Sequence, residues 1–187
     1  AACFAISSGI ASATTFLLNS STVNVGSISD TIVVDGIALE ISAVSQTDAM
    51  APLGGNAEQI GVLTTGEASG EEINALGAQS VEFINFEFDQ PVILNAVYTR
   101  GHSEAEKATL IIEADGVFEW MGSADGSGSV VINEFLPSQN FAVISPGEVG
   151  TGFGLSRIDV TFVPEPSAMI LALGGLLALG LGRRRSR

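Results

Sequence analysis

Residues 81–99, VEFINFEFDQPVILNAVYT, carry the clearest strand pattern of the chain. Apolar and polar residues alternate over the first half of this stretch, which is typical of a β-strand with one buried and one solvated face. The alternating residues are Ile84, Phe86 and Phe88 on one face and Asn85, Glu87 and Asp89 on the other. Val81 and Phe83 are out of phase with the apolar face, which predicts a β-bulge near Phe83. Asp89-Gln90-Pro91 predicts a turn between two strands, because proline cannot donate a ladder hydrogen bond.

Similar strand and turn signals extend outward in both directions. Asp35-Gly36 lies between two β-branched runs, and this dipeptide predicts a hairpin with a type I′ turn. Asp115-Gly116 predicts a second hairpin in the same way. Further short strands are expected at residues 60–63, 109–113, 117–121, 130–132, 141–144 and 154–162. About nine or ten short strands without an amphipathic helix predict an all-β fold, a single antiparallel β-sandwich of jelly-roll type.

The region between residues 47 and 79 is rich in glycine and acidic residues and is expected to form a long loop with one short strand. Four oxygen-bearing side chains lie close together within it: Glu67, Glu71, Glu72 and Asn74. Calcium takes six to eight oxygen ligands from carboxylates and loop carbonyls. These residues are therefore candidate calcium ligands, and a plain solvated loop is the alternative; no other cofactor is expected.

Charge and cysteine content limit the possible functions. Between residues 14 and 162 there are 20 acidic residues, and the only basic ones are Arg100, Lys107 and Arg157, which leaves a net charge near −17. Such a surface repels nucleic acid and anionic lipid, so no nucleic-acid partner is expected. The single cysteine, Cys3, lies outside this region, so the region has neither a disulfide nor a thiol nucleophile.

Residues 1–13, AACFAISSGIASA, are small and apolar. They predict the end of a secretory signal peptide with an A-x-A cleavage site formed by Ala11 and Ala13. Cleavage there would leave Thr14 as the first residue. The alternative is lipidation at Cys3, because Ala1-Ala2-Cys3 matches the end of a lipoprotein signal.

The last 25 residues, 163–187, have three parts in a fixed order. The first is Pro164-Glu165-Pro166, whose prolines stop any strand or helix that enters from the preceding residue. An apolar run follows at 168–182, and it predicts a hydrophobic helix that is short for a membrane span of about 20 residues. The final part is a basic cluster that would stay on the cytoplasmic side of a bilayer. Its residues are Arg183, Arg184, Arg185 and Arg187.

This tail resembles the PEP-CTERM sorting signal of Gram-negative bacteria that make exopolysaccharide, and the resemblance covers about the last 24 residues. It implies that exosortase, a membrane enzyme, recognises and processes the tail, which would hold the protein in the inner membrane only transiently. The resemblance therefore predicts a secreted or cell-surface protein in which residues 14–162 are the cargo. The alternative is an ordinary membrane anchor.

Catalytic signals in the cargo are few. His102 is the only histidine, no G-x-S-x-G motif accompanies it, and we expect it to be a surface loop residue. Neighbouring acids such as Glu71-Glu72 arise by chance in so acidic a domain, so we expect no enzymatic activity. Tyr98 and Trp120 are the candidate glycan contacts, because sugar binding on a sandwich commonly uses an exposed aromatic ring. Trp120 shares a strand face with Phe118, so the alternative places it in the core.

Together these observations predict a secreted, non-enzymatic surface or matrix protein that interacts with exopolysaccharide in a biofilm or floc. Two alternatives remain open: a secreted glycoside hydrolase that uses paired carboxylates, and a calcium-dependent carbohydrate-binding module.

Overall fold

A computed structural model of the protein describes residues 13–45, 51–63, 72–77, 80–113, 116–132, 136–145 and 152–163. These residues form twelve strands and no helix, and every strand pair among them is antiparallel. The predicted all-β antiparallel fold is therefore confirmed. In this part of the chain no helix is long and apolar enough to cross a membrane.

Several predicted features lie outside the described residues. They are the signal-peptide residue Ala11, the possible lipidation site Cys3, the C-terminal hydrophobic helix, and the sorting-signal residues Pro164, Glu165, Pro166, Arg183, Arg184 and Arg185.

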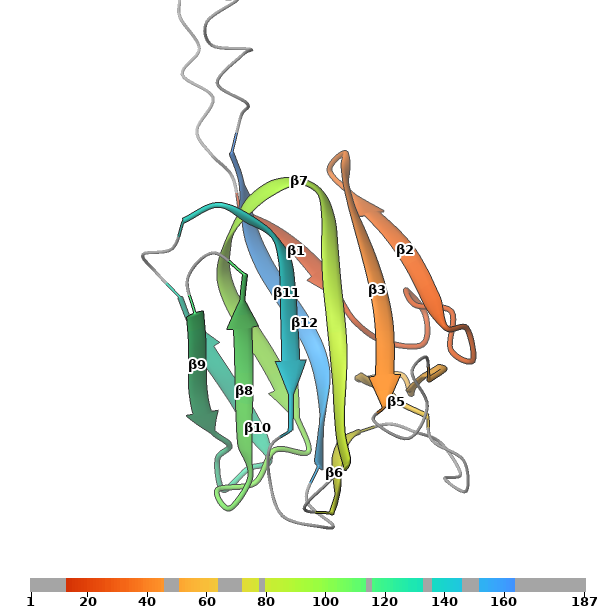
Figure 1. Ribbon diagram of the computed structural model, residues 1–187, viewed down its shortest axis with the longest axis vertical. Coiled ribbons are helices and arrows are strands. Elements are labelled where there is room, and N and C mark those ends of the chain that lie inside the picture. Colours follow the sequence, from red (N-terminus) through yellow and green to blue (C-terminus); the bar gives the residue numbers. More distant parts are fainter. Residues whose placement is uncertain are drawn as a thin grey trace, which may run out of the picture.

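The strand β7 (Ser80–Arg100) belongs to both layers of the fold (Figure 1). Its first half pairs with β3 (Ile37–Ser45) and β11 (Ser138–Ile144). Its second half pairs with β12 (Gly152–Phe162) and β10 (Ser127–Val131). In Figure 1, β7 rises in front, arches over the upper end of the molecule and descends behind. The fold is thus a sandwich-like pair of layers that share one continuous strand.

We call the layer at the front of Figure 1 the first sheet and the layer behind it the second sheet. The first sheet has the order β2 (Ser29–Val34), β3, the first half of β7, β11, β8 (Lys107–Ile112) and β9 (Gly116–Met121). The second sheet has the order β10, the second half of β7, β12 and β1 (Ala13–Leu17). Three short strands, β4 (Leu53–Gly55), β5 (Ile60–Val62) and β6 (Ile73–Gly77), pair with one another or with β12 and β7.

The predicted turn at Asp89-Gln90-Pro91 is wrong, because β7 continues through it. Pro91 lies between Phe88, the last β7 residue that pairs with β3, and Val92, the first that pairs with β12, so its missing N–H falls between these two ladders. The predicted bulge near Phe83 is also wrong. Phe83 stays in register with Val44 and Ile144 and faces outward. The inward position beside it belongs to Glu82, which is fully buried.

The Asp35-Gly36 hairpin is confirmed. Both residues have positive φ, 52° and 82°, as a type I′ turn requires, and the flanking Val34 and Ile37 are paired. The side chain of Asp35 accepts a hydrogen bond from the hydroxyl of Thr14 at 3.2 Å, which ties the turn to β1.

The hydrophobic core fills the space between the two sheets. Phe16 from the second sheet packs edge-on against Phe88 at 5.6 Å between ring centres, and Phe88 packs edge-on against Phe141 at 5.7 Å. All three rings are buried, as the alternation in β7 predicted for Phe88. Because inward positions fill the core, the outward positions of both sheets are available for function.

Candidate functional site

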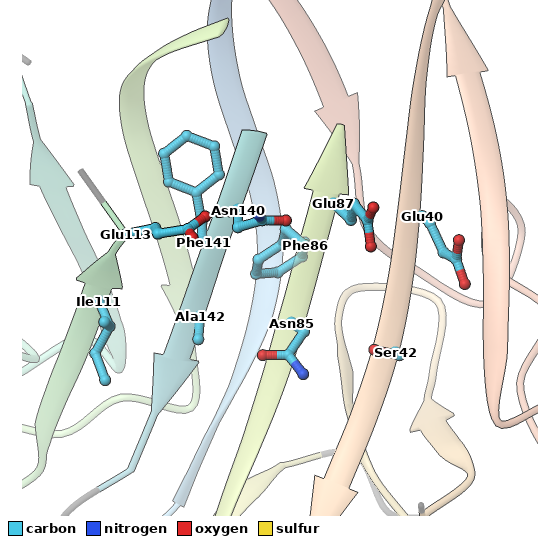
Figure 2. Close-up of a pocket in the computed structure, with 10 residues that line it drawn as sticks. All are labelled: Glu40, Ser42, Asn85, Phe86, Glu87, Ile111, Glu113, Asn140, Phe141 and Ala142. Atoms are coloured by element: carbon cyan, nitrogen blue, oxygen red, sulfur yellow. Dashed lines mark hydrogen bonds between the residues drawn. The ribbon is translucent and has the colours of Figure 1, made fainter. Parts of the chain in front are cut away.

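The outer face of the first sheet carries a groove of about 450 Å³, which we call the Glu87 groove (Figure 2). It crosses β3, β7, β11 and β8. Its floor includes Phe86 and Phe141, which are almost entirely buried. The side chains that project outward from these strands are Glu40, Ser42, Asn85, Glu87, Ile111, Glu113, Asn140 and Ala142.

Strand register arranges these side chains in two rows, because residues two apart on a strand share one face. The first row runs Glu40, Glu87 and Asn140 across β3, β7 and β11 and continues to Glu113, the residue that follows β8. The second row runs Ser42, Asn85, Ala142 and Ile111. In the first row the amide of Asn140 donates a hydrogen bond to Glu113 Oε2 at 2.6 Å. The two rows give the groove a regular spacing along the strands.

The Glu87 groove is acidic. Glu40, Glu87 and Glu113 are exposed, and no lysine or arginine is among the described residues that line it. Glu40 and Glu87 are directly opposite each other, so their Cβ atoms lie about 5 Å apart and their charges repel. Carboxylates accept hydrogen bonds, whereas the amides of Asn85 and Asn140 both donate and accept. The groove can therefore bind a ligand that carries many hydroxyl groups.

A second groove of about 1000 Å³ lies on the outer face of the second sheet, and we call it the Tyr98 groove. Tyr98 pairs with Ser129 on one side and with Arg157 on the other. The guanidinium carbon of Arg157 lies 3.8 Å from the centre of the Tyr98 ring, and Nη2 donates to Asp159 Oδ2 at 2.9 Å. Tyr98 thus forms part of the groove wall with a cation stacked on it.

Asp125 lies on the rim of the Tyr98 groove and is held by two serines. It accepts hydrogen bonds from the hydroxyl of Ser123 and from both the hydroxyl and the backbone N–H of Ser127. These bonds, the one from Ser123 first, lower the pKa of Asp125 to about 2. The rim therefore keeps a negative charge at any pH at which the protein is expected to work.

His102 is fully buried, so its predicted place on the surface is wrong. Its Nε2 lies 2.8 Å from the carbonyl oxygen of Glu106 and must donate, and its Nδ1 lies 2.8 Å from the hydroxyl of Thr99 and therefore accepts. Burial lowers the pKa of His102, against the opposing hydrogen bond and charge of Glu106. A Cβ on Gly128 would clash with Nδ1, which shows how closely β10 covers the ring.

The two predicted glycan contacts have different environments. Tyr98 lines a groove, but Trp120 is only 9% exposed and belongs to the core. Its ring centre lies 6.1 Å from that of His102, and the His102 ring lies 4.6 Å from that of Phe153. Trp120 therefore supports the packing around His102.

The predicted calcium ligands are only partly placed. Glu67 and Glu71 lie outside the described residues, Glu72 is half-buried, and the backbone of Asn74 belongs to β6 rather than to a loop. Within the ranges that the structure describes, no group of three or more His, Cys, Asp and Glu residues is arranged to hold a metal ion. Ala13, from the predicted cleavage site, begins β1 and pairs with Thr161 of β12.

Sequence reasoning missed most of the residues in the two grooves. The outward positions Asn85 and Glu87 were visible in the alternation of β7. Their neighbours Asn140 and Glu113 come from β11 and the end of β8, and no local sequence pattern indicates that these strands lie beside β7. Arg157 was visible only as one of three cations in an acidic domain.

The fold and the two grooves define the class of the protein: an antiparallel all-β sandwich with polar grooves on its outer faces. No family model and no curated protein matches the chain. Among solved structures it is similar to a family two carbohydrate esterase from Cellvibrio japonicus, at 12% identity and a TM-score of 0.36, over 83% of this chain and 36% of that one.

The chain is also similar to a low-affinity xylan-binding module from the gut symbiont Roseburia intestinalis, at 11% identity and a TM-score of 0.34, over 84% of this chain and 98% of that one. The chain spans about a third of the length of the esterase. Similarities this weak do not assign a function to the chain. A function has to be inferred from the residues of the grooves.

Proposed function

We propose that the protein is a non-enzymatic, polysaccharide-binding protein of the cell surface or extracellular matrix, and that the polysaccharide lies along the Glu87 groove. One observation carries this proposal: two rows of outward side chains, rich in hydrogen-bonding groups, cross four neighbouring strands (Figure 2). Neighbouring strands lie about 4.8 Å apart, so each row extends about 14 Å, which suits an extended chain of sugars.

The chemistry of the rows suits sugar hydroxyl groups. Each hydroxyl donates one hydrogen bond and accepts others, and the carboxylates of Glu40 and Glu87 accept while the amide of Asn85 does both. Ile111 is 36% exposed at the β8 end of the second row and offers an apolar contact. Open, solvated grooves of this kind bind with modest affinity per contact, because each polar group exchanges water for ligand.

The arrangement of the carboxylates supports binding rather than hydrolysis. A glycoside hydrolase places its two carboxyl groups on opposite sides of the scissile bond. Glu40 and Glu87 instead stand side by side on adjacent strands and project from the same face into solvent. The glycoside hydrolase remains the alternative, and its pair would be these two residues.

We propose further that the protein is exported, and that exosortase processes the segment beginning at Pro164 in the inner membrane of a Gram-negative bacterium. The three-part order of residues 163–187 supports this proposal, and the pairing of Ala13 with Thr161 is compatible with it. The start of β1 and the end of β12 lie together at the upper end of Figure 1, so the chain enters and leaves the sandwich at one end. Cleavage after Ala13 would remove only the first residue of β1, and cleavage within the tail would lie beyond the end of β12.

Affinity electrophoresis of the exported protein in gels that contain host exopolysaccharide, or xylan as a neutral polymer, tests the proposal. We expect retarded migration for the native protein and a loss of retardation in Asn85→Ala and Glu87→Gln. Glu104→Gln removes the same charge from an exposed loop position outside the groove and is the matched control. Migration that no polymer retards would reject the proposal, and release of reducing ends that stops in Glu87→Gln would favour the hydrolase.

A further inference from the structure

We propose that the Tyr98 groove is a second binding site and that it takes a carboxylated sugar, a uronate unit of an acidic polysaccharide. This site lies on the opposite sheet from the Glu87 groove. The inference extends the proposed function and shares with it only the premise that the ligand is a glycan.

The distribution of positive charge singles out this groove. The domain has three cationic side chains against 20 acids, and two of the three, Arg100 and Arg157, line the Tyr98 groove beside the acids Glu58 and Asp125. The third, Lys107, projects from β8 and pairs with Glu119 at 2.8 Å. The Glu87 groove has none of them. Since charges more than about 8 Å apart are largely screened at physiological salt, nearby side chains rather than the net charge decide where an anion binds.

Arg157 is already oriented for a carboxylate. Its guanidinium is stacked on Tyr98 at 3.8 Å, and Nη2 is bonded to Asp159 at 2.9 Å. Because arginine has five N–H donors in a rigid plane, one ion pair leaves donors for a ligand. Within the described part of the chain, 39% of the side chain is exposed, although Nε itself is buried and has no hydrogen-bond partner, so a ligand would meet the terminal nitrogens. Stacking therefore fixes the plane of the guanidinium before a ligand arrives.

Arg100 supplies the second cation two residues along β7 from Tyr98, on the same face. Its Nη1 lies 3.3 Å from Glu58 Oε2, with 57% and 67% of the two side chains exposed. Exposed ion pairs contribute little to stability, so a ligand carboxylate can replace Glu58 at small cost. Charge-assisted bonds from arginine to a carboxylate are stronger than neutral ones and are often bidentate.

The rest of the groove suits a sugar ring. Ser129 and Ser156 offer hydroxyl groups beside Tyr98, and Ser156 already donates to the carbonyl oxygen of Tyr98 at 3.3 Å. Leu17 and Met121 are 52% and 50% exposed at the edges and can cover the apolar face of a sugar. The two arginines favour a ligand with a carboxylate, while the serines, Leu17 and Met121 favour a sugar ring.

Isothermal titration of the exported protein with an oligomer of galacturonic acid tests the inference. The comparison ligand is the same oligomer with its carboxylates reduced to alcohols. We expect the uronate oligomer to bind about tenfold or more tightly than the reduced one, which corresponds to the loss of one charge-assisted contact. Its affinity should also fall as salt is raised. Equal binding of the two oligomers, or no binding of the uronate, would overturn the inference.

Variants locate the site. Arg157→Gln and Arg100→Gln should each weaken uronate binding by about tenfold, and Arg157→Lys should recover only part of it, because lysine lacks the planar fork. Lys107→Gln removes the same charge elsewhere and should bind normally. Thermal melting would reveal whether Arg157→Gln unfolds. Arg100 is exposed, so Arg100→Gln should stay folded and tests the site in that case. Equal weakening in Lys107→Gln would overturn the site.

The two proposals can fail separately. Loss of uronate binding with retained binding of neutral polymer rejects the Tyr98 site alone. Binding of uronate by a protein that no neutral polymer retards rejects the Glu87 groove alone.

Discussion

The hydroxyl of Thr99 donates a hydrogen bond to Nδ1 of His102 at 2.8 Å, inside the protein. This direction holds for the neutral imidazole, whose other nitrogen donates to the carbonyl of Glu106. The Thr99–His102 pair lies where β7 turns into the loop that leads to β8, directly beneath Gly128 of β10. The pair therefore packs against the end of β10 beside the Tyr98 groove.

Acid should destabilise the protein through His102. Burial lowers its pKa in the folded state below the ordinary value of 6.5, so the unfolded state takes up a proton first as the pH falls. The stability that neutral His102 contributes is complete above pH 6.5 and is lost as the pH falls through the folded pKa. Melting temperatures should therefore decline more steeply between about pH 7 and 5 in the native protein than in His102→Gln. Parallel curves would contradict this assignment.

The register of β7 predicts unequal effects of two phenylalanines. Phe88 is buried among Phe16 and Phe141, so Phe88→Ala should lower the free energy of unfolding by about 3–5 kcal/mol. Phe83 faces outward and is half-buried, so Phe83→Ala should cost clearly less. Urea unfolding monitored by circular dichroism measures both. Equal losses would mean that Phe83 faces the core, as a bulge would require.

The carboxyl group of Asp125 should titrate with a midpoint of about 2, well below its ordinary value of 3.8. The stability contributed by its bonds from Ser123 and Ser127 is complete above pH 3.8 and is lost as the pH falls through about 2, where the carboxylate that accepts them is protonated. The carbon chemical shift of this carboxyl group, followed by NMR across the acid range, measures the midpoint directly. In Ser123→Ala the midpoint should rise toward 3.8, and an unchanged midpoint would show that this serine is not the main cause.

The tail can be tested in the native host. If exosortase acts on it, protein released at the surface should lack Arg183, Arg184, Arg185 and Arg187 by intact mass. Replacing Pro164, Glu165 and Pro166 together with alanines should leave the protein in the membrane, because the apolar run still anchors it while the recognition motif is lost. Release of full-length protein, or normal release of the alanine variant, would reduce the tail to an ordinary anchor.

Local sequence patterns predicted strand faces well where the inside is apolar. The alternation of Ile84, Phe86 and Phe88 and the Asp35-Gly36 turn both depend on nearby residues and are present as expected. The orientation of Phe83 was predicted wrongly, because the prediction assumed that an aromatic residue is buried and added a bulge to the strict alternation. The chain keeps the alternation and buries Glu82 instead.

Features that depend on distant partners could not be predicted in this way. The passage of β7 through Pro91 depends on where two different sets of strands end. His102 is buried because Gly122 and Gly128 let a loop and a strand approach it closely, which its own neighbours in sequence do not indicate. The grooves likewise arise from the pairing of β11 and β12 with β7, which alternation alone leaves open.

The continuity of β7 has a mechanical consequence. Asn85 and Glu87 in one groove and Tyr98 and Arg100 in the other belong to a single strand, joined by covalent bonds across the bend at Pro91. If each groove held a separate polymer, tension between the polymers would travel along this backbone. Where such a pull acts along the strand axis, the ladder hydrogen bonds, which lie perpendicular to the strand, would be loaded together in shear instead of opening one after another. A single small domain would then act as a tie between two fibres of a stretched matrix.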